Sequence, residues 1–88
     1  MTSELIKQKL TEAFKPDLIE IIDDSAAHAG HAGAQKGGGH YNVTIVSELF
    51  DGKSLVQRHQ LIYQTLNDLM KNDIHALGIN ALSPSENL

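Results

Sequence analysis

The chain of 88 residues contains no cysteine, so it can form no disulfide and can offer no thiolate to a metal ion or a redox reaction. It has no apolar run near the ~20 residues that cross a bilayer. The N-terminal sequence MTSELIKQKL carries an early acid, Glu4, and is typical of neither a secretory signal nor a transit peptide. A positive charge excess is also missing, because the formal net charge is −4 with neutral histidines. These absences favour a cytoplasmic protein with no membrane partner and no electrostatic drive toward phosphate backbones.

Groupings that support catalysis are scarce as well. No serine stands in a nucleophile setting, and no pair of carboxylates has the pattern of an acid–base dyad. The segment SELFDGKS contains one glycine and lacks the pattern of a phosphate-binding loop. We therefore expect no enzymatic activity.

Two stretches of the chain predict helices. Ser3 is placed to cap a first helix that runs to about Phe14, and Pro16 prevents its continuation. Ser54 begins a second, long helix, and Gln57 three residues further on completes a capping box. This second helix is expected to continue to the sequence KND at 71–73.

Stretches rich in β-branched residues predict three strands, at 17–22, 40–50 and 74–82. In the second strand Tyr41, Val43 and Ile45 share one face. We expect residues 1–88 to form one domain, with a flexible loop at 23–39 and a tail at 83–88. The predicted order is α-β-β-α-β, a two-layer α+β fold with a three-stranded sheet.

Four of the five histidines fall where this order brings them together. His28 and His31 lie in the Gly/Ala-rich loop, which leads directly into His40, and His75 begins the third strand. Because a long helix joins the second strand to the third, these two strands are expected to be parallel, with their starts at the same edge of the sheet. We therefore expect these four histidines to converge, with His59 nearer the opposite edge.

The histidines admit two interpretations. Neutral imidazole binds zinc, copper, nickel and iron, which favours a metal site at this edge. The sequence HAGH is not the i, i+4 pair of a helical zinc site, however, and equally describes two solvated loop residues. His40 equally suits a strand-opening residue bonded to backbone, and His75 a half-buried residue with one partner. The only arginine, Arg58, either contacts phosphate or pairs with Asp51 or another acid.

The segment HYNVTIVSELFDGKSLVQRHQLIYQTL, followed by IHALGINALSPSE, resembles the BolA family. The resemblance depends on the pair His40–Tyr41, on the run VS..F.GKS..QRH..IY from Val46 to Tyr63, and on the tripeptide HAL that begins at His75. It covers essentially the whole chain. It implies an α-β-β-α-β fold with a three-stranded mixed sheet, similar to class II KH domains.

The resemblance also implies a function. Its best-supported form is a partner of a monothiol glutaredoxin that shares a 2Fe–2S cluster with it, in iron–sulfur trafficking or iron regulation, and holds no cofactor alone. The resemblance implies His75 as one cluster ligand. Because DDSAAH matches the loop pattern of the histidine-type members, it implies His28 as the other, with His31 in reserve. A glutaredoxin cysteine and glutathione would supply the remaining two of the four ligands.

A second function is implied by the same resemblance, since members of the family have also been described as transcriptional regulators. A KH domain binds nucleic acid through a GxxG loop between helices, and no such loop is placed that way here. The lysines are dispersed along the chain and the net charge is negative. Any DNA affinity is therefore expected to be weak.

Overall fold

The computed structural model describes residues 2–25 and 39–87. The elements follow in the order α1 (Thr2–Phe14), β1 (Leu18–Asp23), β2 (Gly39–Val46), the 3-10 helix η3 (Glu48–Phe50), α2 (Leu55–Thr65), α3 (Asn67–Met70), β3 (Ile74–Leu82) and the 3-10 helix η4 (Pro84–Asn87). The strands form one sheet in the order β1-β2-β3, with β1 antiparallel and β3 parallel to β2. The predicted α+β fold with a mixed sheet is confirmed, and the KH-like comparison is compatible with it.

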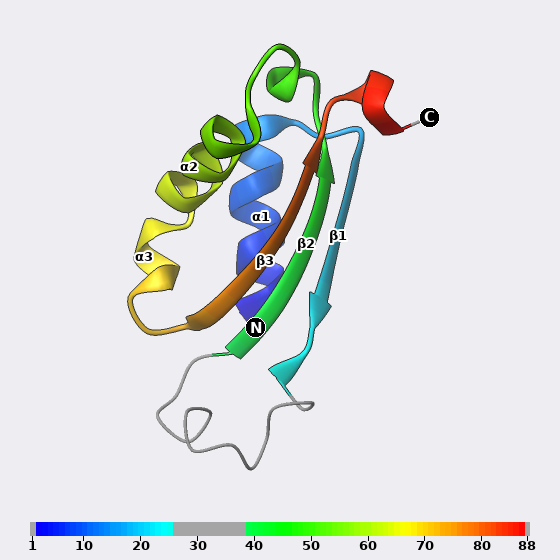
Figure 1. Cartoon of the computed structure of the whole chain (residues 1–88). Coiled ribbons are helices and arrows are strands. Elements are labelled where there is room, and N and C mark those ends of the chain that lie inside the picture. Colours follow the sequence, from blue (N-terminus) through cyan, green and yellow to red (C-terminus); the bar gives the residue numbers. More distant parts are fainter. Residues whose placement is uncertain (1, 26–38, 88) are drawn as a thin grey trace.

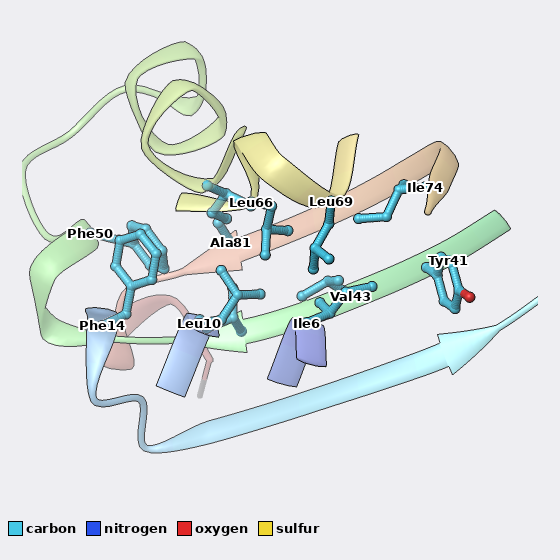
Figure 2. Close-up of a cluster of buried hydrophobic side chains, with 12 residues drawn as sticks. Ile6, Leu10, Phe14, Tyr41, Val43, Phe50, Leu66, Leu69, Ile74 and Ala81 are labelled. Carbon is cyan, nitrogen blue, oxygen red and sulfur yellow. The ribbon is translucent and has the colours of Figure 1, made fainter. Parts of the chain in front are cut away.

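The molecule has two layers, because the helices α1, α2 and α3 all lie on one face of the sheet (Figure 1). Alternate residues of β2 point into the space between the layers, and Tyr41, Val43 and Ile45 are buried there. Figure 2 shows the side chains that meet them from the other elements, among them Ile6, Leu10 and Phe14 of α1, Leu66, Leu69, and Ile74 and Ala81 of β3. The predicted inward face of the second strand is therefore confirmed.

The second strand ends earlier than its sequence predicts. β2 stops at Val46, and Ser47 turns the chain into η3 by accepting a hydrogen bond from the Leu49 N–H at 3.2 Å. The same hydroxyl donates to the carbonyl of Phe14 at 2.7 Å. Phe50 is then fully buried against the Phe14 ring, with centroids 5.0 Å apart, whereas Leu49 is 51% exposed. The prediction of a strand through Phe50 was wrong because a serine that bonds to nearby backbone offers the chain an alternative to the sheet.

The second predicted helix begins as expected and then divides. Both halves of the capping box are present: the Gln57 N–H donates to the Ser54 hydroxyl, and the Ser54 N–H donates to the Gln57 side chain. The helix is interrupted at Leu66, between α2 and α3. Just before the break, the Thr65 hydroxyl donates to the carbonyl of Leu61 at 2.8 Å, a type of contact that bends helices. No helix in the described part of the chain is long and apolar enough to cross a membrane.

The residues of interest lie at one end of the strands, which we call the open edge of the sheet. β1 ends there, and β2 and β3 both begin there, at the bottom of Figure 1. At the opposite edge β3 ends and continues into η4, so that residues 84–87 of the predicted tail form a 3-10 helix. The parallel pairing of β2 and β3, predicted from the helical connection, is confirmed.

Candidate functional site

His75 occupies an irregular step in the ladder between β2 and β3. Gly39 pairs with Ile74 and His40 pairs with Ala76, so that β3 carries one extra residue, His75, between these two pairs. Ile74 points into the core and is 3% exposed, while His75 and Ala76 are both exposed. Bulges of this kind re-aim side chains and occur often beside functional sites. The irregularity turns the His75 imidazole away from the core at the open edge of the sheet.

The rings of His40 and His75 lie next to each other. Their centroids are 5.2 Å apart and their planes are inclined by 46°. His40 is partly buried and His75 is exposed, so solvent reaches the pair. The two strand starts therefore bring together two of the four histidines that were predicted to converge.

The start of the loop is fastened to this edge by a short polar network. The Ser25 N–H donates to the Asp23 carboxylate at 2.9 Å, and the His40 N–H donates to the Ser25 hydroxyl at 3.1 Å. The Asp24 N–H donates to the His40 carbonyl at 2.7 Å. Hydrogen bonding to Ser25, through its side chain first and its backbone second, lowers the pKa of the Asp23 carboxyl. The sequence DDS has the composition of an Asx turn, which would have revealed the first of these contacts.

A glycine gives the same network room on the open face of the sheet. The Asn42 amide donates to the Asp24 carboxylate at 2.6 Å, and a Cβ added to Gly78 would overlap the Asn42 Oδ1. Asn42 therefore lies across Gly78, its partner in the register of β2 and β3. A shallow hollow of about 230 Å³ is lined here by Asp24, His40, Asn42 and Gly78 among others. An asparagine and a glycine in two strands carry no motif, so the sequence did not predict a role for these residues.

His28 and His31, the two predicted loop ligands, lie outside the described residues. Across 2–25 and 39–87, no three side chains of the types His, Cys, Asp and Glu are grouped closely enough to hold a metal ion. The described part of the chain thus supplies a pair of imidazoles at the open edge. Further ligands would have to come from elsewhere.

Arg58 belongs to the opposite end of β3. Its guanidinium is almost fully buried and donates to the carbonyls of Lys53 and Ala81 at 3.0 and 2.9 Å and to the Glu86 carboxylate at 2.6 and 3.2 Å. Hydrogen bonds from Arg58 are the main reason that the pKa of Glu86 falls to about 2. Of the two interpretations of Arg58, pairing with an acid is confirmed, and the acid is Glu86. His59 follows Arg58 on α2, so it belongs to the far end of the sheet, as expected.

Comparisons with known proteins converge on one family. The profile of the BolA family, described as BolA-like protein, matches residues 10–86. The chain is 45% identical to SufE-like protein 1, chloroplastic/mitochondrial, of Arabidopsis thaliana across 92% of its own length, and spans 23% of that protein. It is 38% identical to the DNA-binding transcriptional regulator BolA of Vibrio cholerae, across 98% of this chain and 78% of that one.

Solved structures agree. The BolA domain of SufE1 from Arabidopsis thaliana superposes with a TM-score of 0.84 at 45% identity, covering 97% of this chain and 94% of that one. The solution structure of BolA1 from Mus musculus gives a TM-score of 0.77 at 35% identity, with coverages of 94% and 65%. The similarity therefore extends over the whole described fold, including the edge where β2 and β3 begin.

Proposed function

The chain belongs to the BolA family, and from this premise we propose that it binds a monothiol glutaredoxin and shares a histidine-ligated 2Fe–2S cluster with it, in iron–sulfur trafficking or iron regulation. The observation that carries the proposal is the position of His75. An irregular step in the sheet exposes this imidazole at the open edge, where the loop that contains His28 and His31 begins. A ligand for a cluster presented by another protein needs that exposure.

The side chains of this protein could supply two of the four ligands of such a cluster. A 2Fe–2S cluster takes four ligands, and a chain without cysteine can offer imidazoles but no thiolates. His75 would be one ligand and His28 the second, leaving two thiolates to glutaredoxin and glutathione. Imidazole ligation would raise the reduction potential of a cluster bound at this site.

The anchored start of the loop supports His28 over His31. Ser25 is held by its contacts with Asp23 and His40. His28 follows Ser25 by three residues in the sequence, and three residues of extended chain span at most about 10 Å. His31 follows Ser25 by six residues, and a chain of that length spans up to about twice that distance. His31 remains the reserve ligand.

The role is proposed to be that of a binding partner in the cytoplasm, with no catalytic activity of its own. The names of three relatives describe a transcriptional regulator or a BolA-like protein, and none of the three describes an enzyme. Plant relatives are named as chloroplastic, so an organellar compartment is the alternative.

DNA binding is the second candidate function, and the names of two bacterial relatives favour it. The Vibrio cholerae and Escherichia coli proteins, 38% and 35% identical to this chain, are each called DNA-binding transcriptional regulator BolA. The net charge of −4 opposes strong phosphate binding. A salt titration distinguishes the cases: tight binding at physiological ionic strength, with a steep dependence of log K on log salt, would favour a DNA-binding role.

The deciding experiment is co-expression with a monothiol glutaredoxin and purification without oxygen, followed by visible absorption and circular dichroism. We expect a coloured heterodimer whose spectrum changes in His75→Ala and in His28→Ala. His59→Ala, at the far end of the sheet, is the matched control and should leave the spectrum intact. Failure to associate, or a spectrum that ignores His28→Ala, His31→Ala and His75→Ala alike, would rule out cluster sharing.

A further inference from the structure

We propose that Ser25 is a positioning residue for His75, the ligand that β3 would offer to a shared cluster. Ser25 holds the backbone of Gly39 and His40, and this backbone lies opposite the irregular step where β3 carries His75 as an extra residue. The part of this role that concerns the cluster rests on the proposed function. The part that concerns the place of the His75 ring is a property of the free protein.

The Ser25 hydroxyl replaces the last backbone hydrogen bond between β1 and β2. The register pairs Asp23 with Tyr41, so Asp24 lies opposite His40 at the next step. In a regular antiparallel ladder, the two residues of a hydrogen-bonded pair exchange both of their N–H···O=C bonds. Here the Asp24 N–H donates to the His40 carbonyl at 2.7 Å, but the His40 N–H donates to the Ser25 hydroxyl at 3.1 Å. A side chain therefore fixes the start of β2 where a backbone carbonyl would ordinarily do so.

Gly39 lets the Ser25 side chain approach the start of β2 closely. A Cβ added to Gly39 would overlap both the Tyr41 ring and the Ser25 hydroxyl. Only a glycine leaves room for these two groups beside the backbone at this position. Tyr41 is buried and belongs to the hydrophobic core, at the end of the core nearest the open edge (Figure 2). Ser25 is thus packed at a point of β2 that is also fixed by the core.

The backbone that Ser25 holds also holds the start of β3. The Gly39 N–H donates to the Asp73 carbonyl at 3.0 Å, and His40 pairs with Ala76. His75 lies between these two points of attachment, and its ring lies beside the His40 ring, with centroids 5.2 Å apart. Because both attachments depend on Gly39 and His40, a shift of these two residues would move the His75 imidazole.

Nuclear magnetic resonance of the free, full-length protein tests the place of the His75 ring. In the wild type we expect a nuclear Overhauser cross-peak between the ring protons of His40 and His75, because the rings are neighbours. In Ser25→Ala this cross-peak should be lost. The His40 amide should exchange its hydrogen about 2–10-fold faster in Ser25→Ala than in the wild type, as expected for the loss of one hydrogen bond.

Two further variants separate positioning from a general loss of stability. Ser25→Thr keeps the hydroxyl and should show the cross-peak of the wild type. Ser54→Ala removes the cap of α2, at the far end of the sheet, and should lower the stability to a comparable extent while keeping the cross-peak. A cross-peak that persists in Ser25→Ala, or that is missing from the wild type, from Ser25→Thr or from Ser54→Ala, would overturn the role of Ser25.

The complex with a monothiol glutaredoxin tests the same role in cluster binding. The Ser25→Ala complex should differ from the wild-type complex in its visible circular dichroism and lose its cluster about 2–10-fold faster. The Ser25→Thr and Ser54→Ala complexes should match the wild type. An unchanged spectrum and rate of loss in Ser25→Ala would refute the positioning of the cluster ligand. A wild type that binds no cluster would instead refute the proposed function, and the ring contact in the free protein would still decide whether Ser25 positions His75.

Discussion

Replacing Phe50 with alanine tests where β2 ends and what η3 does. The side chain is fully buried and packs on the Phe14 ring at 5.0 Å. Truncating a buried phenylalanine to alanine costs about 3–5 kcal/mol in the free energy of unfolding. A domain of this length is stable by about 4–13 kcal/mol in total. Since 1 kcal/mol shifts the Tm of such a domain by about 4–8 °C, Phe50→Ala should lower the Tm by at least about 12 °C.

Leu49→Ala is the matched control, because a strand that continued past Val46 would bury Leu49, whereas η3 buries Phe50. Had the strand continued past Val46 with the alternation of Tyr41, Val43 and Ile45, Leu49 would face the core and Phe50 the solvent. With η3 in place, Leu49 is 51% exposed and its truncation should cost within about 0.5 kcal/mol.

Urea unfolding of the wild type and both variants, followed by far-UV circular dichroism, gives the two free energies. A large loss at Phe50 with a negligible loss at Leu49 supports the turn at Ser47. The reverse order of the two losses would show that β2 continues as a strand, and the description of η3 would then be wrong.

Three other contacts give predictions of stability, each measured by urea unfolding. Because Arg58 lowers the pKa of Glu86 from 4.5 to about 2, this pair should contribute fully to the free energy of unfolding above about pH 4.5 and lose its contribution between about pH 4.5 and 2. Glu86→Gln should flatten that part of the pH dependence, and equal acid sensitivity of the wild type and the variant would contradict this. Ser54→Ala removes a cap and should cost about 1 kcal/mol, whereas no loss would mean that the capping box adds nothing. Gly78→Ala should destabilise the wild type through contact with Asn42 but not the Asn42→Ala variant, and an additive double-mutant cycle would refute that contact.

Much of the fold could be predicted from local patterns. The alternation of Tyr41, Val43 and Ile45 specified the inward face of β2, and the Ser54–Gln57 box specified the start of α2. The long helical connection between β2 and β3 predicted their parallel pairing. These signals succeed because periodicity and capping act over a few residues, within reach of a sequence window.

The candidate site was predictable in outline only. The topology placed His40 and His75 at one edge, and the structure brings their rings together. The predicted topology did not reveal the bulge that exposes His75, since the register of a strand depends on how its partner packs. It also gave no sign that Asn42 lies across Gly78, because that contact joins residues 36 positions apart.

The order of elements, the inward face of β2 and the absence of any thiolate ligand could be predicted from the chain alone, because they depend on side-chain chemistry and local spacing. Three features depend instead on tertiary packing: the acid that pairs with Arg58, the residue at which β2 stops and the histidine that is turned outward. Each of these features depends on a partner distant in the chain. Arg58 donates to Glu86, Ser47 donates to the Phe14 carbonyl, and the residues on either side of His75 pair with the start of β2. Such partners become neighbours only once the helices have packed on the sheet.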